Sequence, residues 1–296
     1  MAKITSTGRA LARTSAEATT TPSRWRVGDP VLVLTYAHSG VARLRRLLGA
    51  HPDLACLSGV GIAHLCDQVL NSLGRLGPSV GRSADGVPSA LAVAATKSMI
   101  NTVVGADLVR SGKTRWCDTT PGAAPAVDAF LRCYPETTFI SLHRHCASMI
   151  SAALSASPWG LSNPGFAPFA ATHPANNVAA LAMYWAAHTE AILTEEAAHP
   201  DDCHRLRYED LTARPGKTAS EIYAFLGLDQ MSHIFPAHGL FPAHGPGENG
   251  ADATGTVAEA TDDGRQVPAD MLGPGLLTMV NDLLSELGYP PIQPAE

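Results

Sequence analysis

Residues 30–48 constrain this chain more than any other stretch, because they combine a buried strand, a tight turn and the start of a helix. Residues 31–34 form a short apolar run with branched side chains, which is typical of a parallel strand buried on both faces. Three leucines recur at helical spacing within residues 44–48, shortly after Gly40. A helix that begins there directs free backbone N–H groups toward the turn, so the stretch predicts an anion-binding loop.

The loop itself reads Thr-Tyr-Ala-His-Ser-Gly-Val-Ala at residues 35–42 and matches neither G-x-x-x-x-G-K-[ST] nor G-x-G-x-x-G. It resembles the T-Y-P-K-S-G-T-T loop of the sulfotransferases, which holds the 5′-phosphosulfate of 3′-phosphoadenosine 5′-phosphosulfate (PAPS). The resemblance implies a cofactor-binding role for Thr35, His38, Ser39, Gly40, Val41 and Ala42. His38 replaces the family's Lys, while Val41 and Ala42 replace two Thr.

Two later segments resemble further contacts of that family with its cofactor. Thr120-Pro121 resembles the end of a K-T-P turn in which Thr119 replaces the Lys. Residues 134–144 resemble a strand whose terminal Arg grips the 3′-phosphate together with a Ser eight residues later. Arg144 is present, but position 152 is Ala. The nearest hydroxyls are those of Ser148 and Ser151.

The second half of the chain carries a signature of the same fold. Residues 207–227 contain R-Y-E-D-L, a Pro and F-L-G in the family's order. Residues 245–250 resemble its late G-x-G-D-x-K loop, where Glu248 keeps the acid and Gly250 replaces the Lys. The resemblance therefore implies an α/β protein of the P-loop-like sulfotransferase fold, in which a central parallel sheet carries helices on both faces.

The predicted domain covers residues 29–296, because residues 1–28 have no periodicity and read as a disordered or loosely attached tail. Hydrophobic periodicity predicts several helices in the domain. Their expected ranges are 62–76, 90–109, 126–133, 177–198 and 274–287. Residues 74–88 are rich in Gly, Pro and Ser, which indicates a surface loop.

Charge and composition exclude several classes of protein. Residues 1–27 hold five basic residues and one acidic residue, which leaves 16 basic and 26 acidic groups in the other 269. Such an acidic body is a poor surface for nucleic acid. No apolar run reaches the length of a membrane span and no signal-type segment opens the chain, so we expect a cytoplasmic protein without a membrane partner. Neither the six scattered cysteines nor any His pattern has metal-ligand spacing, and we expect no metal.

The replaced positions coincide with the cofactor contacts, which leaves three interpretations of function. A repurposed enzyme would act on a small molecule, with elimination or ring closure that expels sulfate. A PAPS-dependent sulfotransferase would transfer a sulfuryl group to a hydroxyl or amine. A non-catalytic chain would form a heterodimer with an active sulfotransferase, and a homodimer is open under all three. We expect PAPS and adenosine 3′,5′-bisphosphate to bind weakly, because each charge-assisted contact contributes about 1.5–3 kcal/mol.

Three residues are candidates for the chemistry, each with a structural alternative. His38 occupies the loop position at which charge develops, although a neutral imidazole there could simply donate a hydrogen bond. His64 lies in the region from which family members draw a base, and is otherwise a surface helix residue. Asp118 is either a base or the cap of the helix that follows it.

The composition, rich in Ala, Gly and Pro with few Lys, is typical of a high-GC bacterial source and favours specialised metabolism as the setting.

Overall fold

The computed structural model describes residues 29–57, 59–77, 80–83, 85–156, 164–230 and 269–293. The predicted tail and the late loop at 245–250, with Glu248, lie outside these ranges. Five parallel strands form one sheet in the order β2-β3-β1-β4-β5. Their bounds are β1 Val31–Leu34, β2 Leu54–Leu57, β3 Arg115–Asp118, β4 Thr138–His143 and β5 Cys203–Arg207. The predicted central parallel sheet is confirmed.

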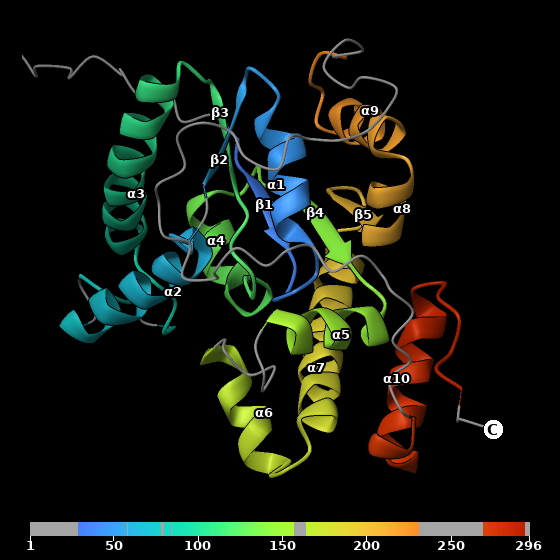
Figure 1. Ribbon diagram of the computed structural model, residues 1–296. Coiled ribbons are helices and arrows are strands. Elements are labelled where there is room, and N and C mark those ends of the chain that lie inside the picture. The colour runs from blue at the N-terminus through green and yellow to red at the C-terminus, as the bar shows by residue number, and fades with distance from the viewer. Residues whose placement is uncertain are drawn as a thin grey trace, which may run out of the picture.

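Helices cover both faces of this sheet (Figure 1). Those in the first half of the chain are α1 Val41–Gly49, α2 Ile62–Leu73, α3 Ala90–Ser111, α4 Val127–Cys133 and α5 Cys146–Ala156. The others are α6 Ala167–Thr172, α7 Asn177–Ala198, α8 Tyr208–Ala213, α9 Pro215–Phe225 and α10 Pro274–Glu286. The helix expected at 62–76 ends earlier, since its last three residues form a separate 3₁₀ turn, Gly74–Leu76.

The two faces can be read from the alternation of side chains along β1, the central strand. Leu32 and Leu34 point into a core built with α2, α3, α4, α5, α7 and α10. Val31 and Val33 point the opposite way, toward α1, α8 and α9. Both sets are fully buried. The continuous apolar run that predicted a strand buried on both faces therefore reflects two separate cores.

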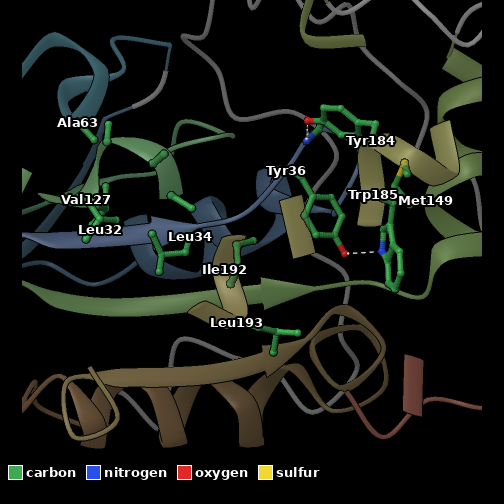
Figure 2. Packing of buried hydrophobic residues seen from close by; sticks show 14 of the residues in the cluster. Leu32, Leu34, Tyr36, Ala63, Val127, Met149, Tyr184, Trp185, Ile192 and Leu193 are labelled. Atoms are coloured by element: carbon green, nitrogen blue, oxygen red, sulfur yellow. Dashed lines mark hydrogen bonds between the residues drawn. The ribbon is translucent and has the colours of Figure 1, made fainter. Parts of the chain in front are cut away.

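Three loops meet at the carboxyl edge of the sheet, where β1 lies between β3 and β4. The Gly122 N–H after β3 donates to the Thr35 carbonyl after β1 at 2.7 Å. The Tyr36 hydroxyl accepts the Arg144 N–H after β4 at 2.8 Å and also accepts from the Trp185 indole at 3.0 Å. Figure 2 shows Tyr36 and Trp185 with the hydrogen bond that joins them. Ligands of open α/β sheets bind at this kind of edge, so the fold prepares a site there.

A buried ionic network joins α7 to β4 and to the edge strand β5. Glu196 accepts from His143 at 2.9 Å, from Arg205 Nε at 2.7 Å and from the Ser141 hydroxyl. The side chains of Ser141 and His143 are fully buried. Although burial opposes ionisation, the hydrogen bonds from His143, Arg205 and Ser141 together lower the pKa of Glu196 to about 2.

We expect Glu196→Ala to destabilise the fold by about 2–4 kcal/mol, because it leaves the buried side chains of Ser141 and His143 without their acceptor. Arg205 is partly exposed, so the loss is smaller than for a fully buried ion pair. The folded pKa lies below the ordinary value, so the stabilisation is complete above pH 4.5 and is lost as the pH falls toward 2. Urea unfolding of the wild type and Glu196→Ala at pH 7, 5 and 3 measures this. A stability difference between the two that does not shrink at pH 3 would contradict the assignment.

Candidate functional site

The loop between β1 and α1 is held in an unusual backbone conformation. His38 and Gly40 both have positive φ, 61° and 91° respectively. A Cβ on Gly40 would lie 2.1 Å from Cδ2 of Tyr208, the first residue of α8. The Tyr of the R-Y-E-D-L signature therefore packs directly on the loop Gly, which explains why these two distant sequence features occur together.

The first turn of α1 offers unpaired donors to a ligand. In the described structure the backbone N–H groups of Gly40, Val41 and Ala42 have no hydrogen-bond acceptor, and no side chain caps this helix end. The two matching hydroxyls are used within the loop, where Thr35 Oγ1 and Ser39 Oγ lie 2.7 Å apart. What remains is a backbone cradle at the positive end of a helix, which suits one phosphate- or sulfate-sized anion.

Arg144 lies beside this cradle, so the predicted neighbourhood of loop and Arg is present. Its Nη1 donates to the His38 carbonyl at 3.0 Å, and its guanidinium stacks over the Tyr208 ring at 4.2 Å. The residue is 5% exposed, and its buried Nε has no partner among the described residues. A buried guanidinium N–H without an acceptor costs free energy. The site is therefore a fit for an additional anionic oxygen.

His38 has an environment that keeps its imidazole neutral. Burial, followed by the neighbouring Arg144 charge, lowers its pKa to about 4. Its ring stacks on Phe166, with ring centres 5.9 Å apart. The unliganded loop therefore lacks the permanent cation that a Lys would provide, and His38 does not replace that cation at neutral pH.

Asp118 is a structural residue rather than a free base. It is fully buried, and its carboxylate accepts from the Ile62 N–H at 2.7 Å and from the hydroxyl and N–H of Thr120. Burial raises its pKa above the ordinary value. The expectation that it caps the helix following it was wrong, since it caps the start of α2, whose N-terminus reaches the same sheet edge.

His64 on α2 and His188 on α7 both lie close to Gly122. A Cβ on Gly122 would lie 3.9 Å from Nε2 of His64 and 4.0 Å from Nε2 of His188, so the two nitrogens are within about 8 Å of each other. Gly122 in turn is bonded to the loop through the Thr35 carbonyl. The predicted His64 is thus part of the site, next to a second imidazole that the sequence analysis did not single out.

The protonation of His188 is set by its own helix. Its Nδ1 lies 2.9 Å from the Tyr184 carbonyl, which can only accept, so the neutral ring carries its proton on Nδ1 and a lone pair on Nε2. Burial lowers the pKa of His188 below its ordinary value, although the bond to Tyr184 opposes this. Nε2 is therefore a ready proton acceptor at neutral pH.

A row of aromatic rings connects this base to the anion cradle. Phe166 meets Tyr184 edge to face at 4.5 Å, and the Tyr184 and His188 rings lie 4.0 Å apart. The Tyr184 hydroxyl accepts the Ala37 N–H at 3.0 Å, a bond drawn in Figure 2. Tyr184 is therefore a buried core residue that also joins α7 to the loop through its hydrogen bond with Ala37.

The remaining predicted site residues are less well placed. Thr119 is buried, and its hydroxyl donates to the Leu57 carbonyl at 2.9 Å, so it provides no charge where the family has Lys. Ser148 and Ser151 lie half-buried on α5. Their proposed role toward a 3′-phosphate stays a prediction. Within the described ranges, His, Cys, Asp and Glu side chains form no group of three or more that could hold a metal ion.

The sequence analysis missed His188 because its signal is weak. Tyr184 and His188 recur at helical spacing in residues 177–198, a pattern that equally fits an ordinary core face.

In the part of the chain that the structure covers, no helix is both long and apolar enough to cross a membrane.

Two solved structures share this architecture at 17% sequence identity, a level that establishes similarity of fold. The sulfotransferase domain from the Synechococcus PCC 7002 olefin synthase superposes with a TM-score of 0.51, over 89% of this chain and 96% of that domain. The sulfotransferase domain from the curacin biosynthetic pathway gives 0.53, over 89% and 98%. No curated protein sequence matches the chain. A family model described as the sulfotransferase family matches residues 30–232, more than two thirds of the sequence, and the chain therefore belongs to the sulfotransferase family.

Proposed function

We propose that this protein is an enzyme of sulfate-ester chemistry on a small molecule, with the sulfate held at the start of α1 and a proton removed by His188. The observation that carries the proposal is the Nε2 lone pair of His188, which is fixed as an acceptor by the Tyr184 carbonyl at Nδ1 and lies near Gly122 beside the loop. An anion cradle and a neutral base at one sheet edge are the two groups that such chemistry needs.

The weakened cradle favours sulfate as a leaving group. In this reaction His188 takes a proton from the substrate, the electron pair forms a double bond or closes a ring, and the carbon–oxygen bond to sulfate breaks. The expelled sulfate carries two negative charges, which the N–H groups of Gly40, Val41 and Ala42 and the guanidinium of Arg144 would stabilise. These donors suit one small anion and need no Lys at positions 38 or 119.

A second function, transfer of a sulfuryl group from PAPS to a hydroxyl or amine, is favoured by the unpaired Nε of Arg144. The same backbone donors and this guanidinium fit the anionic end of PAPS, which would supply the activated sulfuryl group. His188 would then take the proton from the acceptor. The names of the two similar domains refer to an olefin synthase and a biosynthetic pathway, which supports a small-molecule substrate in specialised metabolism.

Calorimetric titration with adenosine 3′,5′-bisphosphate at pH 8 and pH 6 separates these functions. We expect a Kd above about 10 μM, changed less than about threefold between the two pH values, because an imidazole with a pKa of about 4 is neutral at both. Sub-micromolar binding at pH 8 would instead support PAPS-dependent transfer. A gain of more than tenfold at pH 6 would show that the bound ligand raises the pKa of His38, so that it becomes the missing cation.

Turnover assays complete the test of the proposal. Release of inorganic sulfate from alkyl sulfate esters, with an alkene or a ring as the organic product, is the expected activity. Release of adenosine 3′,5′-bisphosphate from PAPS with alcohol, phenol or amine acceptors is the activity of the second function. Absence of both activities in a protein that stabilises or activates a sulfotransferase would identify a non-catalytic partner.

A further inference from the structure

The chain returns to the anion site after its last helix, α10. The Tyr289 side chain is 6% exposed, and its hydroxyl donates to Glu209 Oε2 at 2.6 Å. The His143 carbonyl lies 3.3 Å from the same hydroxyl. Burial, and then the Glu209 charge, raise the pKa of Tyr289 above its ordinary value, so this hydroxyl stays a donor at neutral pH. Tyr289 therefore contacts both the end of β4 and the start of α8.

The second carboxylate oxygen of Glu209 reaches the main chain on the other side of Arg144. Glu209 Oε1 accepts the His145 N–H at 3.1 Å. The His143 carbonyl belongs to the peptide group just before Arg144, and the His145 N–H belongs to the one just after it. Tyr289 and Glu209 together therefore hold the two peptide groups that meet at the Cα atom of Arg144.

The remaining polar atoms of these two peptide groups are bound by the aromatic pair described above. The Arg144 N–H donates to the Tyr36 hydroxyl at 2.8 Å, and the Arg144 carbonyl accepts from the Trp185 indole at 2.9 Å. Each of the four polar atoms thus contacts a side chain. Because peptide groups are planar, fixing two consecutive ones fixes φ and ψ between them, and with these the direction of the Cα–Cβ bond.

The Arg144 side chain depends on this backbone for its direction. Its guanidinium is held by the His38 carbonyl and the Tyr208 ring, neither of which is a counter-ion. Tyr208 and Glu209 are the first two residues of α8, so one helix start supports both the side chain and the main chain of Arg144. We propose that Glu209 and Tyr289 are positioning residues of the anion site, which direct Arg144 toward the bound anion. The inference rests on the anion-binding role proposed above for Arg144.

The segment that carries Tyr289 is also held by contacts that do not involve its hydroxyl. The Arg207 guanidinium stacks over the Tyr289 ring, 4.0 Å from its centre, and its Nη1 donates to the Gly288 carbonyl at 3.2 Å. His145 Nε2 lies 3.1 Å from the Pro290 carbonyl. Tyr289→Phe should therefore leave the segment in place and remove only the bonds of the hydroxyl.

Calorimetric titration of the full chain with adenosine 3′,5′-bisphosphate tests the inference. For Tyr289→Phe we expect the Kd to rise about tenfold, the lower end of the loss seen when the partner of a metal-ligating side chain is removed. Glu209→Ala should weaken binding at least as much. Glu209→Gln should keep most of the affinity, because its amide oxygen still accepts the His145 N–H.

Tyr134→Phe is the matched control. Tyr134 is 4% exposed, and its hydroxyl donates to Asn101 at 2.8 Å, between α4 and α3 and away from Arg144. Both Phe variants should lower the melting temperature, whereas the Kd of Tyr134→Phe should stay within about twofold of wild type. An unchanged Kd for Tyr289→Phe, or an equal loss of affinity in the control, would overturn the inference.

An Arg144→Lys background shows whether Tyr289 acts through Arg144. A Lys ammonium has no planar fork to direct, so adding Tyr289→Phe there should weaken binding by less than about twofold. A further tenfold loss would refute a positioning role. If the wild type binds no bisphosphate at up to about 5 mM, the proposed anion site fails. Melting temperatures then decide this inference, since additive losses for Tyr289→Phe and Arg144→Lys would show that the two residues are not coupled.

Discussion

Replacing His188 by Ala is expected to lower kcat/KM by about 10²- to 10⁴-fold, whichever of the two proposed reactions the protein catalyses. The substitution removes the Nε2 acceptor near Gly122 while leaving the anion cradle and Arg144 unchanged. Affinity for adenosine 3′,5′-bisphosphate should therefore stay within about twofold of wild type. A loss of affinity equal to the loss of turnover would contradict a base role for His188 and indicate damage to the loop.

The pH dependence provides a second measure of the same role. Burial lowers the pKa of His188, so the base form dominates at pH 7 and turnover should fall only as the pH drops below 6.5. His204→Ala is the matched control, because His204 is also partly buried with a lowered pKa but lies on the edge strand β5. His64→Ala tests the other imidazole; a large loss there and none at position 188 would transfer the base role to His64.

Gly40→Ala is expected to destabilise the fold by about 2–5 kcal/mol. A left-handed residue with a side chain costs about 1–2 kcal/mol, and φ at Gly40 is 91°. The new Cβ would also lie 2.1 Å from the Tyr208 ring, an overpacking that costs a further 1–3 kcal/mol or so. Thermal melting should show a decrease of about 4–20 °C for a domain of this size.

Gly112→Ala separates the two causes. Gly112 ends α3 with φ of 71°, and a Cβ there would meet no atom within 4 Å, so only the backbone cost of about 1–2 kcal/mol should appear. Equal losses for Gly40→Ala and Gly112→Ala would show that Tyr208 does not crowd the loop. Combining Gly40→Ala with Tyr208→Ala should destabilise less than the sum of the single losses, because the clash is then absent.

The local elements of this fold follow from local sequence. A short apolar run predicted the strand at 31–34, and helical spacing predicted the helix that follows the turn at Gly40. The helix at 177–198 has the bounds that the sequence predicted. The resemblance at residues 134–144 also located Arg144 at the loop. These predictions succeed because backbone preference and burial leave periodic patterns within some ten to twenty residues.

The chemistry of the site depends on contacts that no local pattern records. His188 became a candidate base only because α7 passes Gly122. The carboxylate of Asp118 is engaged by hydrogen bonds because the start of α2 reaches it. The neutral state of His38 likewise follows from burial and from Arg144, which lies more than a hundred residues away. By itself the sequence determined the family and the fold, and it predicted an anion-binding loop. Which side chains are free to react was decided by the tertiary structure, because desolvation and hydrogen-bond pairing are properties of the packed chain.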